Sequence, residues 1–440
     1  MFSHSDTKHI IECFLGVPPK KNRGRVVRCI FFVKNKKGCR FHPSRNSQQI
    51  SSEPESPESR AAFPILYICV LTPQMYLKQL SLVNFKNISG ADMELGKKFN
   101  CFVGNNGSGK TTVLDAVHYL SMCKSFLNSI DSQNITREQP FMVVSGTFDK
   151  DSEEEKIHCA LKREGKKQFK RNKKDYARLI DHVGLFPSVI IAPTDADIIN
   201  GGSDLRRKFL DGVISQLDRE YLENLIQYNK ALLQRNALLK YFRENRTFQP
   251  ESLEMWDVQL SQRGQLIYER RKAFLADFIE AFSAFYKTIS GSVEEIGLTY
   301  ESQLSDGEML GLLKENVAQD RAATYSTIGI HKDDLGFTVN GFQLKKFGSQ
   351  GQQKSALVAL KLAQFKVMHE KSGITPLLLL DDIFDKLDDD RVGQLLKLVS
   401  QKAFGQIFIT DTHPARVAEL LKDEKDVRVF PISQGEVVLG

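Results

Sequence analysis

The 440-residue sequence has no long apolar run. Its longest apolar stretch, AAFPILYICVL at residues 61–71, contains a proline and is too short to cross a bilayer. The stretch also begins too far from the start of the chain to be the apolar region of a secretory leader. We therefore expect a globular protein that stays in the cytoplasm and has no membrane partner.

Paired cysteine motifs are also missing. The seven cysteines are odd in number, and none belongs to a CxxC pair or to a cysteine and histidine spacing typical of a metal site. This pattern favours free thiols in a reducing compartment and gives no sign of a disulfide framework or a structural metal.

Excess charge is confined to one end of the chain. Residues 1–74 hold 12 Lys and Arg against 5 Asp and Glu, and the remaining residues hold 49 of each. The main body is therefore neutral, so any contact with nucleic acid must come from local basic patches.

Residues 1–74 combine a basic run with a polar stretch, SRNSQQISSEPESPESR, that cannot support a packed core. We expect a basic and polar tail that is either disordered or the product of a start codon assigned too early. A basic DNA-binding arm is the alternative. Apolar residues alternate from Met75 onward, which predicts the first strand of the folded part.

Hydrophobic periodicity divides the rest of the chain into three parts. Residues 75–200 contain short strand-like runs around one helix, and residues 326–440 contain expected strands at TPLLLLDD and GQIFITDT with a helix between Gln352 and Glu370. Residues 201–325 instead show apolar residues at helical spacing, which predicts two long antiparallel helices, Phe209 to Leu239 and Leu253 to Ile289. The prediction is an α/β fold with a mixed sheet built from both ends of the chain and a mainly helical lobe inserted between them.

The segment GNNGSGKT at residues 104–111 has the pattern of a P-loop. It follows the strand-like KFNCFV and leads into the apolar-periodic TVLDAVHYL, which is the strand, loop and helix context of that motif. Its glycines let backbone N–H groups approach phosphates, and the helix start adds a favourable dipole. The predicted nucleotide-binding residues here are Gly104, Asn105, Asn106, Gly107, Ser108, Gly109, Lys110, Thr111 and Thr112.

A P-loop requires a carboxylate that holds the metal ion. Asp381 ends the apolar run of LLLLDD, where with Thr111 it can bind Mg²⁺, and Asp382 stands where a general base or water-orienting group belongs. We assign Lys110, Asp381 and Asp382 as the catalytic residues. An acidic loop exposed to solvent is the structural alternative.

A third stretch, GSQGQQKSALVALKLAQ, opens a long helix with a Ser-Gly-Gln loop. Ser349, Gly351 and Gln352 could offer a hydroxyl, backbone N–H groups and the helix dipole to a γ-phosphate. Ser349 could equally be an ordinary N-cap. The order of the three motifs along the chain favours an ABC-type ATPase head.

These motifs, together with LVNFKN, CKSF, INGGSDLRRKFLD, LLQRNALLK and GIHKDDL, resemble the RecF family, relatives of the SMC proteins in the ABC ATPase class. The resemblance covers nearly all of residues 75–440. It implies a weak ATPase that uses ATP and Mg²⁺, with Ser349, Gly351 and Gln352 touching ATP on a second head. It also implies an ATP-dependent homodimer that clamps duplex DNA near gapped junctions and works with RecR and RecO in repair, with a link to the SOS response.

Some positions depart from the ABC pattern. Gln350 replaces a glycine of ABC transporters, Asp382 replaces their catalytic glutamate, and Asp385 replaces a serine of the interface turn that would include Asp388. His413 and Gln139 are weaker candidates for the switch histidine and the loop glutamine.

Other functions fit the sequence less well. NKKD at residues 172–175 matches a guanine-reading pattern, but its position in a basic run and the order of the motifs exclude a GTPase. A P-loop kinase or other metabolic ATPase leaves the Ser-Gly-Gln helix unexplained. A transporter subunit and a module that has lost hydrolysis are further alternatives.

Two basic clusters are candidates for sequence-independent DNA contact. Residues 162–174 hold eight basic residues in thirteen and predict an exposed hairpin, with Lys166, Lys170, Arg171 and Lys173 as phosphate contacts. The second cluster is Arg206, Arg207 and Lys208. A charged face exposed to solvent is the alternative for both.

Overall fold

The computed structural model describes residues 75–291, 294–383, 389–401 and 403–437. All of them belong to the second of two units, Met1–Ala62 and Phe63–Gly440. The predictions for residues 1–74, Asp385 and Asp388 lie outside the described residues.

A central six-stranded sheet has the order β15-β14-β3-β13-β12-β8. Its strands are β3 (Phe99–Val103), β8 (Ser188–Ile191), β12 (Leu377–Leu380), β13 (Ile407–Asp411), β14 (Val427–Ser433) and β15 (Glu436–Val437). Strand β3 pairs in parallel with β13 and β14, so both ends of the described chain build this sheet, as predicted. All four residues of β12 are fully buried, which confirms the expected strand covered on both faces.

A second six-stranded sheet has the order β2-β1-β4-β5-β6-β7 and is antiparallel. Its strands are β1 (Met75–Phe85), β2 (Ile88–Glu94), β4 (Phe141–Lys150), β5 (Glu153–Lys162), β6 (Gln168–Arg171) and β7 (Lys174–Asp175). Asn172 and Lys173 connect β6 to β7 with φ of 50° and 69°, values typical of a tight hairpin turn. The predicted basic hairpin is confirmed.

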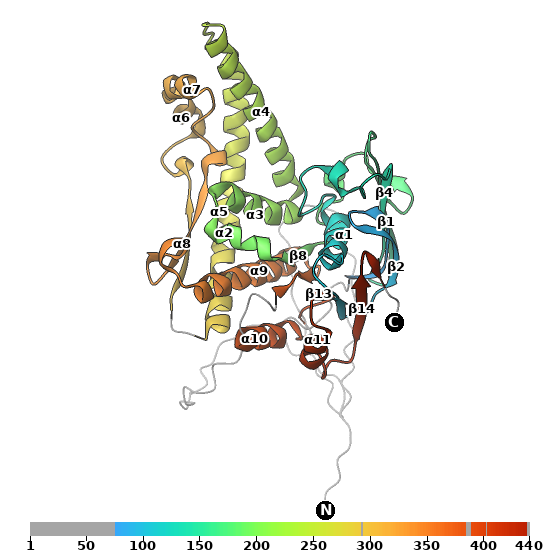
Figure 1. The fold of residues 1–440 in the computed structure, drawn as a ribbon. Coiled ribbons are helices and arrows are strands. Elements are labelled where there is room, and N and C mark those ends of the chain that lie inside the picture. Colours follow the sequence, from blue (N-terminus) through green and yellow to red (C-terminus); the bar gives the residue numbers. More distant parts are fainter. Residues whose placement is uncertain (1–74, 292–293, 384–388, 402, 438–440) are drawn as a thin grey trace, which may run out of the picture. The chain divides into compact units, whose positions relative to one another are not determined.

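The α-helices of the described residues are α1 (Lys110–Met122), α2 (Ala196–Asn200), α3 (Ser203–Leu217), α4 (Arg219–Glu244), α5 (Glu251–Ser290), α6 (Met309–Glu315), α7 (Val317–Ala323), α8 (Leu344–Phe347), α9 (Gln350–Ser372), α10 (Asp389–Val399) and α11 (Pro414–Leu420). Helix α1 contacts both sheets, whereas α4 and part of α5 extend away from them, with α6 and α7 alongside (Figure 1). The prediction of one helix from Phe209 to Leu239 is wrong. Asp218 is extended and its side chain accepts a hydrogen bond from Tyr221 N, so it ends α3 and caps α4.

A three-stranded sheet of order β11-β10-β9 completes the described strands. It consists of β9 (Ile296–Glu301), β10 (Asp334–Val339) and β11 (Phe342–Gln343). Strand β9 lies in the stretch 201–325 and pairs with β10 beyond it. Strand β9 was not predicted from the sequence. The domain boundaries at 200 and 325 remain predictions.

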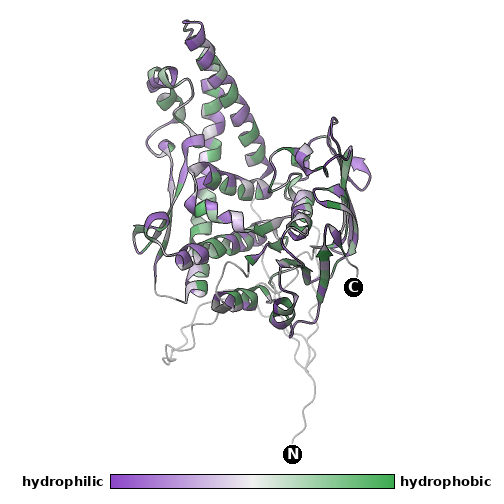
Figure 2. Ribbon diagram, viewed as in Figure 1, coloured by the Kyte–Doolittle hydropathy of each residue, from purple (hydrophilic) through white to green (hydrophobic). Residues whose placement is uncertain are grey.

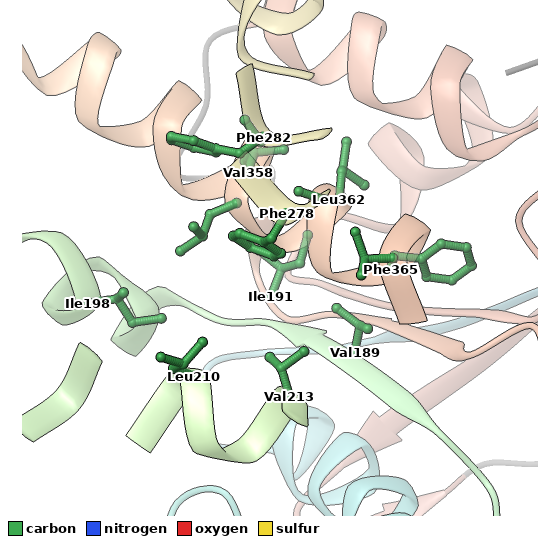
Figure 3. Packing of buried hydrophobic residues seen from close by; sticks show 14 of the residues in the cluster. Val189, Ile191, Ile198, Leu210, Val213, Phe278, Phe282, Val358, Leu362 and Phe365 are labelled. Carbon is green, nitrogen blue, oxygen red and sulfur yellow. The ribbon is translucent and has the colours of Figure 1, made fainter. Parts of the chain in front are cut away.

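The largest core cluster joins the central sheet to the helices (Figure 3). Side chains of β8 meet those of α2, α3, α5 and α9, among them Val189, Ile191, Ile198, Leu210, Val213, Phe278, Phe282, Val358, Leu362 and Phe365. Hydrophobic residues concentrate in the central strands, whereas α4 carries both hydrophilic and hydrophobic residues along its length (Figure 2). Among the described residues, no helix has the length and apolarity needed to cross a membrane.

Candidate nucleotide-binding site

The P-loop lies between the end of β3 and the start of α1, as predicted. Three of its glycines have positive φ: 158° at Gly104, 78° at Gly107 and 118° at Gly109. A Cβ atom at Gly104 would also lie 2.1 Å from the carbonyl oxygen of Ile432. Glycine is therefore required at Gly104 by the close approach of β14 and favoured at the other two by backbone conformation.

Two polar side chains of the loop are positioned for an anion. Lys110 is 4% exposed, and its Nζ donates to the carbonyl oxygens of Gly104 at 2.9 Å and Asn105 at 3.1 Å. The buried hydroxyl of Ser108 has no hydrogen-bond partner within the described part of the chain. Phosphate oxygens would satisfy both groups, because an ammonium and a hydroxyl are natural donors to phosphate.

The predicted metal-binding residues meet at the carboxyl end of β12. Thr111 Oγ1 donates to Asp381 Oδ1 at 2.9 Å, although the two residues are far apart in the sequence. Asp381 is only 5% exposed, and burial raises the pKa of its carboxyl group, while hydrogen bonds from Thr410 and Thr111 oppose that rise. A hydroxyl and a carboxylate in contact are hard oxygen donors of the kind that Mg²⁺ prefers, so the residues fit the ion.

Asp382 follows in a left-handed conformation, with φ of 43°. Its backbone N–H donates to Thr410 Oγ1 at 2.8 Å, and the same hydroxyl donates to Asp381 Oδ1 at 2.9 Å. Thr410 therefore holds both aspartates at one edge of the sheet. The sequence analysis missed Thr410. Its position near the end of the predicted strand GQIFITDT was the available signal.

Asp411 and Arg416 form a second arrangement that the sequence analysis missed. Asp411 is 2% exposed and accepts two hydrogen bonds from Arg416, at 2.9 and 2.8 Å, and one from His413 N at 2.6 Å. The carbonyl oxygen of Asp411 accepts from Gly104 N at 3.2 Å. His413 thus lies near the first residue of the P-loop and is largely exposed. Its role as a switch residue remains a prediction.

The Ser-Gly-Gln loop forms the N-terminus of α9. Gln352 N donates to Ser349 Oγ at 3.2 Å and Ser349 N donates to Gln352 Oε1 at 2.7 Å, which is a capping box. Within the described part of the chain, no hydrogen bond connects Ser349, Gly351 or Gln352 to the P-loop. Ser349 is exposed. The local N-cap reading is therefore confirmed, and the predicted contact with nucleotide on a second head stays a prediction.

Gln139 and the basic cluster 206–208 make their hydrogen bonds to residues outside this site. Gln139 is exposed, and its carbonyl oxygen accepts from Arg163 Nε at 3.2 Å. In the predicted cluster at 206–208, Arg206 binds Asp334 through two hydrogen bonds, and Arg207 donates to the carbonyl oxygen of Asp333. Only Lys208 keeps a largely exposed side chain, so this cluster is a poorer DNA-binding candidate than its sequence indicated.

Known proteins resemble this chain over nearly all of its described part. Residues 76–437 match the family described as RecF/RecN/SMC N terminal domain. The chain is 51% identical to the DNA replication and repair protein RecF of Parabacteroides distasonis over 364 residues, covering 82% of this chain and 99% of that protein. It is 50% identical to RecF of Flavobacterium johnsoniae, covering 79% of this chain and 97% of that protein.

Solved structures agree with this similarity. A structure of the recombination mediator protein RecF with ATP, in the RecFOR pathway, has a TM-score of 0.76 and 31% identity, covering 83% of this chain and 98% of that chain. An Smc head domain from Pyrococcus furiosus has a TM-score of 0.50 at 17% identity, with 83% of this chain covered and 96% of that chain, and is similar in fold alone. The predicted α/β head of the ABC ATPase type is confirmed.

Proposed function

The chain belongs to the RecF family of DNA replication and repair proteins, and we propose that it is a Mg²⁺-dependent ATPase that acts on DNA in recombinational repair and replication-fork recovery. The observation that carries the proposal is the contact between Thr111 of the P-loop and Asp381 at the end of β12. It unites the phosphate-binding loop and the acidic strand end that a P-loop ATPase needs.

Each residue of the site has a distinct part in this proposal. Residues 104–112 bind the phosphates, and Lys110 exchanges its two carbonyl partners for phosphate oxygens. Thr111 and Asp381 would hold Mg²⁺, which supplies charge neutralisation at the phosphates. Asp382 orients the attacking water or accepts its proton.

A second copy of the chain completes the site. We assign Ser349, Gly351 and Gln352 to the ATP bound by the partner head, because they are not hydrogen-bonded to the P-loop of their own head. The exposed N-terminus of α9 is the structural support for this assignment, since its dipole suits a phosphate. ATP would then close two heads into a clamp, and hydrolysis would reopen them.

Duplex DNA near single-strand gaps is the substrate of this proposed clamp. Lys166 and Lys173 of the basic hairpin are exposed and suited to phosphate contact. By family likeness the protein would help RecR and RecO to load recombinase at gaps, act in the cytoplasm at the nucleoid and connect to the SOS response. Residues 75–200 and 326–440 would form the head, and 201–325 the inserted lobe.

Sedimentation velocity tests the clamp. The protein is compared without nucleotide, with Mg²⁺ and a slowly hydrolysed ATP analogue, and as the Ser349→Arg variant. Ser305→Arg places the same charge on an exposed serine of the stretch 201–325 and serves as the control. We expect a nucleotide-dependent dimer in the wild type and in Ser305→Arg, and a monomer in Ser349→Arg.

Two results would change the proposal. A protein that binds nucleotide but stays monomeric, and whose turnover ignores DNA, would favour the P-loop kinase or metabolic ATPase. A protein whose turnover is no higher than that of Asp381→Ala would favour a binding module that has lost hydrolysis.

A further inference from the structure

Asn87 bridges two parts of the P-loop from outside it. It lies in the tight turn between β1 and β2, and its Nδ2 donates to the carbonyl oxygen of Gly107 at 3.1 Å. Its Oδ1 accepts from Thr112 Oγ1 at 2.6 Å. Gly107 is in the middle of the loop and Thr112 is in the first turn of α1, so a single amide spans the segment that contains Lys110 and Thr111.

The hairpin of β14 and β15 also contacts the P-loop. Gly435 N donates to the carbonyl oxygen of Ser108 at 2.9 Å. A Cβ atom at Gly435 would lie 2.1 Å from the carbonyl oxygen of Asn87, and one at Gly109 would lie 3.4 Å from its Nδ2. The turn at Asn87, the P-loop and the β14–β15 hairpin therefore meet without room for additional side-chain atoms at Gly435.

These contacts matter because the glycine-rich loop could otherwise adopt many backbone conformations. Gly107 and Gly109 each have access to more backbone conformations than other residues, so an unbraced loop loses more entropy when phosphate binds. A side chain that already fixes both ends of the segment reduces that loss before the ligand arrives. Asn87 itself is exposed, whereas Thr112 is buried, so the Asn87 amide also satisfies a buried hydroxyl in the first turn of α1.

We infer that Asn87 is a positioning residue for the P-loop, which raises affinity for a nucleoside triphosphate by holding Gly107 and Thr112 in the binding conformation. This inference rests on the proposed ATP-binding function. The amide suits the role because it offers a donor to one partner and an acceptor to the other, which neither alanine nor a carboxylate can do.

The test compares Asn87→Ala with Asn172→Ala. Asn172 is also an exposed asparagine in a tight turn of the same sheet, and its side chain bonds Glu155 and Lys156 instead of the P-loop. Three quantities are measured: affinity for a fluorescent, slowly hydrolysed ATP analogue, hydrogen exchange of the amides at 105–109 without nucleotide, and the thermal midpoint. We expect Asn87→Ala to bind about tenfold more weakly and to exchange faster at the loop, with little change in midpoint. Asn172→Ala should match the wild type in affinity and in loop exchange.

Thr112→Val tests the same bridge from the helix side. Its effect on affinity should overlap with that of Asn87→Ala, so that the double variant binds more tightly than the product of the two single effects predicts. If Asn87→Ala keeps wild-type affinity and wild-type exchange, the inference is overturned while ATP binding stands. If the wild type does not bind the analogue, the proposed function fails, and loop exchange alone then decides whether Asn87 braces the loop.

Discussion

Arg206 and Asp334 form a two-point ion pair that ties the start of α3 to the start of β10. Arg206 Nε lies 2.5 Å from Asp334 Oδ1, and Nη2 lies 2.9 Å from Oδ2. The arginine side chain is 11% exposed and the aspartate 30%. These residues belong to LRRKFLD and GIHKDDL, two stretches that carry the family resemblance, and the pair shows that part of that likeness serves the fold.

Loss of this pair should destabilise the protein. We expect Arg206→Met to lower the free energy of unfolding by about 2 kcal/mol, between the values for exposed and for buried pairs, because Asp334 is left without its partner in a half-buried place. Arg206→Lys should recover only part of this loss, since lysine cannot form the two-point contact. Chemical denaturation measures both.

Lys208→Met is the matched control on the same helix. The Lys208 side chain is 74% exposed and lies 3.6 Å from Asp204, so its removal should change stability by less than about 0.5 kcal/mol. Equal effects of Arg206→Met and Lys208→Met would contradict the structural role of the pair.

His331 should make the protein sensitive to mild acid. Burial, with smaller contributions from Lys332 and Arg207, lowers its pKa from 6.5 to about 4. Its ring bonds the Tyr228 hydroxyl at 2.8 Å and the Ser326 carbonyl oxygen at 3.0 Å. The unfolded chain binds a proton near pH 6.5 and the folded chain only near pH 4, so stability is full above pH 6.5 and is lost as the pH falls between these values. Between pH 7 and pH 5 the loss from this group should be about 2 kcal/mol.

Denaturation curves at several pH values check this dependence. His331→Gln should lose about 2 kcal/mol less than the wild type between pH 7 and pH 5, because it has no proton to gain. A wild-type slope in His331→Gln would show that His331 does not stay neutral in the folded protein.

The sequence predicted the local geometry of the candidate site where its residues follow local rules. The positive φ at Gly107 and Gly109 favours glycine, and the run Leu377–Leu380 suits a strand covered on both faces, as it is in the structure. The P-loop and the strand Leu377–Leu380 bring Lys110, Thr111 and Asp381 to one edge of the sheet. There Thr111 donates a hydrogen bond to Asp381.

The parts that sequence reasoning missed depend on tertiary contacts. Asn87 and Gly435 bond the P-loop from distant segments, and nothing in their own neighbourhoods marks those contacts. Thr410 bonds Asp381 from another strand, and its position at a strand end was its only signal in the sequence. The break at Asp218 was hidden because apolar spacing continues across it, although an aspartate before a helical run is a recognised N-cap. Arg206 was predicted as a candidate DNA contact for a similar reason, since its partner Asp334 lies in β10, far from it in the sequence.

Asp382→Asn should separate hydrolysis from binding. Asparagine tolerates the left-handed backbone at this position, with φ of 43°, as well as aspartate does, so the substitution removes charge with little strain. If Asp382 activates water, the turnover rate should fall about a hundredfold while affinity for the ATP analogue changes far less. Glutamate restores the carboxylate but fits this backbone less readily, so Asp382→Glu should be active at a reduced or similar rate. Unchanged turnover in Asp382→Asn would remove Asp382 from the catalytic residues.

The basic segment 162–174, which includes β6 and the turn into β7, should contribute a salt-sensitive part of DNA affinity, although some of its charges are already paired. Arg171 is paired with Glu155 and Lys170 lies 3.6 Å from Asp175, which leaves Lys166 and Lys173 as the better phosphate contacts. In the double variant Lys166→Gln, Lys173→Gln, duplex affinity should fall, and the slope of log affinity against log salt should decrease by about 2.

A second double variant serves as the control. It carries Lys422→Gln and Lys425→Gln, which remove the same charge from exposed lysines near α11. Fluorescence anisotropy with a gapped duplex at several salt concentrations, in the presence of the ATP analogue, gives both slopes. Equal slopes in the two double variants would mean that net charge, and not the hairpin, governs binding to DNA.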